Sequence, residues 1–100
     1  GAVMPCRPIG VLKMTDEEGD DSKILAVPVD KVSKFHRNVS SPDDIQPALL
    51  ELITHFFEHY KDLEPNKWVK IDGWEDAKAA EDEITAAIEA YQRQPQKPPF

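Results

Sequence analysis

A dense group of carboxylates separates two apolar segments near the start of the chain. The run from Lys13 to Lys23, KMTDEEGDDSK, holds five acidic residues and one glycine. Acids packed this tightly repel one another and persist where a cation is bound, and hard oxygen ligands suit Mg²⁺, Mn²⁺ or Ca²⁺. Asp16 ends the first apolar segment, whereas Asp21 and Lys23 are two residues apart on an incipient strand and so face the same side. The hairpin is therefore a candidate metal site with one ammonium group at its mouth.

Two other interpretations of this acidic hairpin are available. A calcium EF-hand needs acids at loop positions one, three and five, glycine at six and glutamate at twelve. Counted from Asp16, position six is Asp21 and position twelve is Val27, so the EF-hand is excluded. The remaining alternative is a solvated acidic turn, which composition by itself favours because runs of charge usually face solvent.

A second chemical motif is the run His55-Phe-Phe-Glu-His-Tyr-Lys61. Its last two residues, Tyr60 and Lys61, could hold a phosphate group. The same run matches H-x-x-E-H, a zinc-peptidase signature in which His55 and His59 would share one helix face. A peptidase of 100 residues without a supporting domain is implausible, and a subunit interface is a simpler use for two histidines at this spacing.

Length, charge and cysteine content limit the possible functions. One hundred residues make at most one small domain, and we expect residues 1–100 to be a single, partial one because the chain starts at Gly1 and enters strand-like sequence at once. The net charge of −7 argues against nucleic acid or an anionic membrane as partner. The only cysteine, Cys6, fits a reducing compartment and is expected in a buried strand. The absence of a signal peptide or a long apolar run then favours a cytoplasmic location.

The elements that must position the two motifs follow from periodicity. Strands are expected over Cys6–Met14 and Lys23–Val29, and proline in each of them indicates an edge or a bulge. Residues 30–44 form a long polar connection, with one turn capped at Ser41-Pro-Asp-Asp44. A third strand is expected over Lys67–Asp72, giving the order β, β, α, β, α.

Two amphipathic helices complete this expectation. The first begins at Pro47, where proline costs little, and ends near Leu63. Its apolar stripe comprises Leu49, Leu50, Leu52, Ile53, Phe56, Phe57 and Tyr60. The second runs from about Glu75 to Gln92, and its apolar face comprises Trp74, Ala77, Ala80, Ile84, Ala87, Ile88 and Tyr91. Residues 93–100 are expected to be a frayed, proline-rich tail.

Both motifs together resemble one family. The runs CRPIGVLKMTDEEGDDSKILAVP and HFFEHYKDLEPNKWVKIDGWEDAKAAEDEI are similar to the C-terminal half of bacterial family I soluble inorganic pyrophosphatases. The resemblance implies an α+β fold, part of an OB-like five-stranded barrel flanked by two helices. It implies Mg²⁺-dependent hydrolysis of inorganic pyrophosphate, with Asp16 and Asp21 as metal ligands and Glu17 supporting them. Lys23, Tyr60 and Lys61 would bind substrate and take part in catalysis.

The resemblance also implies an assembly and a missing part. His55, His59 and Asp62 match positions at a contact between trimers, so a homohexamer is expected of the intact enzyme. The family's acidic G-D-P-x-D-like strand, which carries further metal ligands and the base, has no match here and would precede Gly1. We therefore expect the chain alone to be inactive. An OB-like binding module remains an alternative, although the negative charge makes a nucleic-acid partner unlikely to be the natural one.

Overall fold

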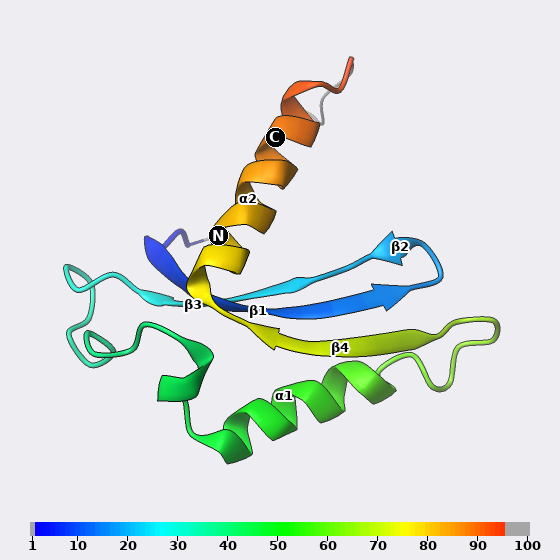
Figure 1. Ribbon diagram of the computed structural model, residues 1–100, viewed down its shortest axis with the longest axis horizontal. Helices are drawn as coiled ribbons and strands as arrows, with labels where there is room; N and C mark the ends of the chain where they lie inside the picture. The colour runs from blue at the N-terminus through cyan, green and yellow to red at the C-terminus, as the bar shows by residue number, and fades with distance from the viewer. Residues whose placement is uncertain (1, 96–100) are drawn as a thin grey trace.

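The first strand is the centre of the sheet. The structure, a computed structural model, describes residues 2–95. The elements in chain order are β1 (Cys6–Asp16), β2 (Gly19–Asp20), β3 (Lys23–Pro28), η1 (Pro42–Asp44), α1 (Pro47–His59), β4 (Val69–Glu75) and α2 (Ala77–Gln92). β1 pairs with β3 and the short β2 along one edge and with β4 along the other, always antiparallel. The expected α+β class is confirmed, but residues 2–95 form an open sheet of four strands and not a closed barrel (Figure 1).

Apolar side chains on β1 form the core. Ile9, Val11, Leu12 and Met14 are all fully buried, and Val27 of β3, Pro42 of η1 and Ala80 of α2 are buried as well. Because neighbouring residues of a strand point to opposite faces, burial of both Val11 and Leu12 means that both faces of β1 are covered. The expectation for Cys6 is wrong, since Cys6 begins β1 at an exposed position where few described residues cover it.

The connection from β3 to α1 is held by local and distant contacts. The predicted capping box is confirmed. The Ser41 hydroxyl accepts a hydrogen bond from the backbone N–H of Asp43, and the Asp44 carboxylate accepts one from the backbone N–H of Ser41. Arg7 donates to the carbonyl oxygen of His36 at 2.7 Å and also to that of Val39. A side chain at Gly10 would overlap the ring of Pro42, so glycine permits this close approach.

Helix α1 lies alongside β4 (Figure 1) and begins at Pro47, as predicted. Its half-buried residues are Leu50, Ile53, Thr54 and Phe57, which follow the i, i+3, i+4, i+7 spacing of one helix face. The indole nitrogen of Trp74 donates to the Thr54 hydroxyl at 3.1 Å. Trp74 therefore belongs to β4 and not to the apolar face of the last helix, which corrects the expectation for that residue.

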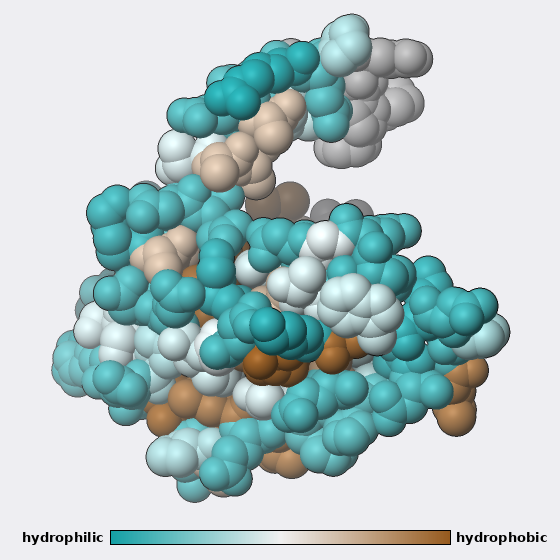
Figure 2. Space-filling model, turned by 45° about the vertical axis from the view of Figure 1, so that its right-hand side comes forward, coloured by the Kyte–Doolittle hydropathy of each residue, from teal (hydrophilic) through white to brown (hydrophobic). Residues whose placement is uncertain are grey.

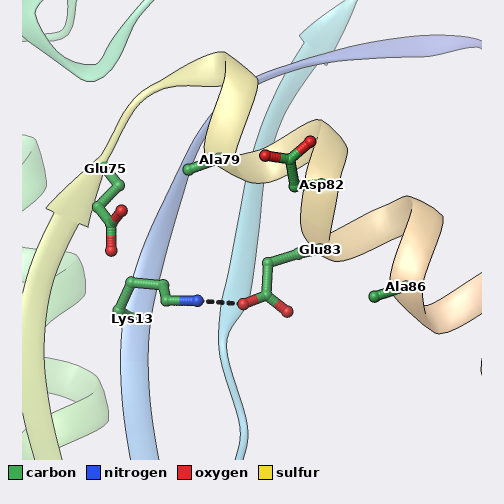
Figure 3. Close-up of a pocket in the computed structure, with 6 residues that line it drawn as sticks. All are labelled: Lys13, Glu75, Ala79, Asp82, Glu83 and Ala86. Atoms are coloured by element: carbon green, nitrogen blue, oxygen red, sulfur yellow. Dashed lines mark hydrogen bonds and ion pairs between the residues drawn. The ribbon is translucent and has the colours of Figure 1, made fainter.

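Helix α2 leaves the sheet after its first turns. Asp76 caps it by accepting a hydrogen bond from the Ala79 N–H at 3.0 Å. Lys13 of β1 pairs with Glu83 across a pocket of about 290 Å³, whose lining is Lys13, Glu75, Ala79, Asp82, Glu83 and Ala86 (Figure 3). Beyond this point the helix rises away from the strands (Figure 1). Residues 96–100 of the expected frayed tail lie outside the described part of the chain.

No helix within residues 2–95 has the length and apolar character needed to cross a membrane.

Candidate active site

Asp16 lies at the end of β1 and is the most enclosed charged residue described. Its relative exposure is 7%, and it is the one buried polar or charged residue found within residues 2–95. Its Oδ2 accepts from the Lys61 ammonium at 2.8 Å, and its Oδ1 accepts from the Glu18 backbone N–H at 2.9 Å. The Lys61 hydrogen bond is the main reason that the pKa of Asp16 is lowered, and Asp16 in turn raises the pKa of Lys61. Both groups are held in their charged forms.

Glu17, the next residue, connects the hairpin to the chain that follows α1. Its carboxylate accepts from Lys61 at 3.4 Å, from Lys67 at 3.1 Å and from the Trp68 N–H at 3.5 Å. A hydrogen bond from its own backbone N–H and then these partners lower the pKa of Glu17. Glu17 therefore links two lysines beside Asp16. Its predicted role in supporting a metal ligand stays a prediction.

Asp21 and Lys23 form the second pair of the hairpin. Lys23 Nζ lies 2.9 Å from Asp21 Oδ1, so the two side chains do share a side, as their spacing predicts. The backbone N–H of Asp21 donates to the carbonyl oxygen of Met14 at 3.0 Å, so Asp21 lies across the hairpin from the end of β1 that carries Asp16. The turn between them needs Gly19, whose φ of 115° is a conformation that side chains disfavour.

Phe57 joins Lys23 to the end of α1. Lys23 Nζ lies 5.4 Å from the centre of the Phe57 ring, and the Tyr60 ring packs edge-on against the same ring at 5.6 Å. Lys61 Nζ lies 5.5 Å from the Tyr60 ring. The structure thus gathers Asp16, Glu17, Asp21, Lys23, Tyr60 and Lys61, all named from the sequence, at one end of β1 and α1.

Two contributors were not named from the sequence. Lys67 was assigned only to the start of a strand, and Phe57 only to an apolar helix face. The antiparallel pairing of β1 with β4 sets Asp16 opposite Val69, which brings Lys67 to Glu17. A sequence signal exists in the basic residue just before β4, but it becomes informative only once this strand pairing is known.

Comparison with known proteins decides the family. The family model described as inorganic pyrophosphatase matches residues 1–92. The chain belongs to the inorganic pyrophosphatase family. Among curated relatives, the pyrophosphatase of Salmonella typhimurium is 57% identical over 89 residues, which is 89% of this chain and 51% of the relative. That of Vibrio vulnificus is 54% identical over 93 residues, again covering 51% of the relative.

Solved structures agree with this membership. An inorganic phosphatase from Anaplasma phagocytophilum superposes with a TM-score of 0.89 at 44% identity, over 93% of this chain and 54% of the other. The inorganic pyrophosphatase of Helicobacter pylori gives a TM-score of 0.85 at 48% identity, over 91% and 54%. The chain therefore spans about half the length of the family members it matches.

The residues at the site fit a partial Mg²⁺ site. Mg²⁺ is usually held by one or two carboxylates together with water and substrate phosphate, and Asp16 and Asp21 supply two carboxylates in one place. Within residues 2–95 no set of three or more carboxylate, imidazole or thiol groups gathers around one point. A bound cation was expected to balance the charge of these acids. The ammonium groups of Lys61 and Lys67 already balance part of the charge of Asp16 and Glu17.

The predicted interface residues gather on the exposed side of α1 and just after it. The rings of His55 and His59 are 4.4 Å apart, and His59 Nδ1 lies 2.8 Å from Asp62 Oδ2. The same two histidines carry the zinc-peptidase motif. Membership in the pyrophosphatase family disfavours both a zinc-peptidase activity and a role as an OB-like module that binds nucleic acid.

Proposed function

We propose that this chain is the C-terminal half of a cytoplasmic, Mg²⁺-dependent inorganic pyrophosphatase, which hydrolyses pyrophosphate to two phosphates. The family membership supports the reaction, and the carboxylate–lysine cluster supports the site. In this proposal the rest of the enzyme closes the open sheet into the OB-like barrel that the resemblance implies. The observation that carries the proposal is the ion pair of Asp16 with Lys61, because it joins the acidic hairpin to the end of α1.

Asp16 and Asp21 are the residues that would hold Mg²⁺. Bound Mg²⁺ would neutralise phosphate oxygens and make water a better nucleophile. Lys61 pairs with Asp16 at 2.8 Å and would share that carboxylate with the metal, so its ammonium group would lie beside the entering phosphate. Glu17 keeps Lys61 and Lys67 on the same side of the hairpin.

Lys23, Tyr60 and Lys61 would bind the substrate. Pyrophosphate is a highly charged anhydride, and cleavage of its P–O bond leaves extra negative charge on the departing phosphate. An ammonium group beside that phosphate stabilises the charge, and a phenol donates a hydrogen bond without competing for the metal. Lys23 and Tyr60 are held in position by Phe57, which contacts both. Water attacks phosphorus directly in this scheme, so no covalent intermediate is needed.

The test uses a hybrid chain. In the hybrid, the part of the Salmonella typhimurium pyrophosphatase that this chain does not match precedes Gly1. We expect Mg²⁺-dependent phosphate release, and we expect Asp16→Asn and Asp21→Asn each to weaken Mg²⁺ affinity by about 10- to 100-fold or more. Glu18→Gln is the matched control, because Glu18 is exposed at the turn and changes charge in the same way. A hybrid in which Glu18→Gln is as harmful as Asp21→Asn would contradict the placement of the metal.

We also propose that the intact enzyme is a homohexamer in which His55, His59 and Asp62 lie at a contact between trimers. At a symmetric contact each copy would present two imidazole rings with centres 4.4 Å apart and the Asp62 carboxylate that pairs with His59. Sedimentation velocity of the hybrid should therefore show a hexamer. His55→Gln and His59→Gln should each shift the population toward trimers. Stoichiometric zinc, or an oligomer indifferent to both substitutions, would overturn this assignment.

A further inference from the structure

Both carboxylate oxygens of Asp16 accept a hydrogen bond from the chain itself. Oδ2 accepts from the Lys61 ammonium at 2.8 Å, and Oδ1 accepts from the Glu18 backbone N–H at 2.9 Å. The Asp16 and Lys61 side chains are largely enclosed, with 8% and 15% of their surfaces exposed. Solvent therefore screens the charges of this pair less than it screens charges on an open surface.

A metal ion that takes Asp16 as a ligand would meet the Lys61 ammonium on the same carboxylate. Two cations held on one carboxylate repel each other, and the repulsion is strong where the surroundings are less polar than water. This repulsion lowers the affinity for the metal unless the ammonium group has a second acceptor close by.

Glu17 supplies a second acceptor for Lys61. Lys61 Nζ lies 3.4 Å from Oε1 and 3.5 Å from Oε2 of Glu17, which is longer than its 2.8 Å hydrogen bond to Asp16. Strong hydrogen bonds between an ammonium group and a carboxylate are shorter than these two contacts, so Glu17 can bind Lys61 more tightly than it does here. Lys67, at 3.1 Å, and the Trp68 N–H, at 3.5 Å, hold the Glu17 carboxylate in place.

A movement of Lys61 from Asp16 toward Glu17 needs little change in the backbone. Lys61 follows Tyr60, the C-cap residue of α1, and its ammonium group ends a flexible four-carbon side chain. The side of the molecule on which the hairpin ends is turned forward in Figure 2, where hydrophilic residues cover most of the surface. An ammonium group displaced from Asp16 therefore enters polar surroundings.

We propose that Lys61 and Mg²⁺ compete for Asp16, and that Glu17 relieves this competition by holding the Lys61 ammonium while the metal is bound. This inference rests on the proposed function, which places Mg²⁺ at Asp16 and Asp21. Glu17 is then a positioning residue that acts on the metal through Lys61. Metal binding also turns the ammonium group away from Asp16, which makes a substrate-binding group available to phosphate only after the metal is in place.

The first experiment measures Mg²⁺ binding by calorimetric titration of the hybrid in the absence of pyrophosphate, at the position that Asp16→Asn weakens. Lys61→Met should tighten this binding by at least about tenfold, because it removes the cation nearest to the metal. Lys67→Met is the matched control, since Lys67 pairs with Glu17 and is more exposed, and it should tighten binding by less than about threefold. Equal tightening in both variants, or no tightening in Lys61→Met, would overturn the inference.

The second experiment tests Glu17. Glu17→Gln should weaken Mg²⁺ binding by about fivefold, whereas Glu18→Gln, which removes the same charge at an exposed position, should weaken it by less than about twofold. When Lys61 is already replaced by Met, Glu17→Gln should change the affinity by less than about twofold, because the two residues act as a coupled pair. An equal effect of Glu17→Gln with and without Lys61 would contradict its action through Lys61.

Lys61→Arg decides the question if Lys61→Met does not fold. It keeps a cation beside Asp16, so it should bind Mg²⁺ no more tightly than the unsubstituted hybrid, and tighter binding would overturn the inference. The two proposals fail in different ways. If Asp16→Asn changes neither Mg²⁺ binding nor phosphate release, the proposed function fails. If Asp16→Asn weakens Mg²⁺ binding but Lys61→Met does not tighten it, the proposed function stands and the competition fails.

Discussion

The two helices use their apolar residues differently. One face of helix α1 is half-buried at Leu50, Ile53 and Phe57, and the Trp74–Thr54 hydrogen bond ties this helix to β4. Helix α2 has the fully buried Ala80 in its first half, whereas each residue from Thr85 to Gln92 is exposed. The two have similar patterns in the sequence but very different surroundings.

That difference separates what the chain can do alone from what it cannot. The end of α1 carries Tyr60, which contacts Phe57, and is followed by Lys61, which pairs with Asp16. These contacts lie within the chain, so half of the site is already arranged. The residues of α2 from Thr85 to Gln92 are exposed, and none of them belongs to the cluster described above.

The largest expected effect contrasts this chain with the hybrid. The chain alone should hydrolyse pyrophosphate at least about 10³-fold more slowly, because groups that act as one unit fail together when some are removed. Phosphate release in excess Mg²⁺ measures the difference. Turnover by the chain alone of about 10 per second, which is ordinary for an enzyme, would show that the half site is sufficient.

The next effect concerns the end of α1. Lys61→Met should lower turnover of the hybrid by about 10²-fold, the usual cost of removing one group that stabilises developing charge. In the chain alone it should raise the pKa of Asp16, because Lys61 is the main cause of its lowering. Carboxyl ¹³C NMR titration measures that pKa. Lys78→Met is the control, since Lys78 is exposed and pairs with Asp82 on α2, away from the hairpin; an equal shift in the pKa of Asp16 in both variants would contradict the role of Lys61.

A smaller effect tests the two helices directly. In the chain alone, Ile53→Ala should lower the free energy of unfolding by about 1 to 3 kcal/mol, because it removes packing against β4. Ile88→Ala should change it by less than about 0.5 kcal/mol, since Ile88 is exposed. Urea unfolding measures both. In the hybrid the cost of Ile88→Ala should grow; an unchanged cost would mean that α2 stays unpacked there.

The smallest expected effect concerns the capping box of η1, which precedes α1. Asp44 accepts hydrogen bonds from the Ser40 N–H and hydroxyl and from the Ser41 N–H, which lower its pKa from 3.8. Its folded pKa lies below the unfolded one, so its stabilisation is present above pH 3.8 and is lost as pH falls through the folded pKa. Asp44→Asn should reduce this acid sensitivity and shift the urea midpoint by less than half the Ile53→Ala effect. Unfolding curves at several acidic pH values measure the slope, and an unchanged slope would refute the assignment.

Local signals in the sequence predicted much of this structure. The start of α1 at Pro47, the capping box at Ser41 and Asp44, and the start of β3 at Lys23 are set by residues close to one another in the chain, whereas β1 runs two residues beyond the predicted end at Met14. For the same reason the hairpin residues could be named as a site, because their proximity needs no knowledge of the fold.

Non-local contacts explain the errors. Trp74 fits the helical period, yet it lies in β4, where it contacts Thr54 twenty residues away. Lys67 joins the site only through the pairing of β1 with β4. Cys6 reads as a buried strand residue, but its burial needs neighbours that residues 2–95 do not provide. The α+β class with two helices is confirmed, whereas the barrel of which this sheet was expected to be a part stays a prediction, because strand closure depends on partners outside residues 2–95.

The contacts of the Phe57 ring limit which substitutions this position can tolerate. One ring contacts both Lys23 and Tyr60, which lie thirty-seven positions apart in the chain. A substitution at either polar residue alters one group, whereas a substitution at Phe57 alters the surroundings of both at once. Positions of this kind tolerate less variation than their apolar character suggests, so a library of random variants should accept fewer replacements at Phe57 than at its neighbour Phe56, which is 58% exposed.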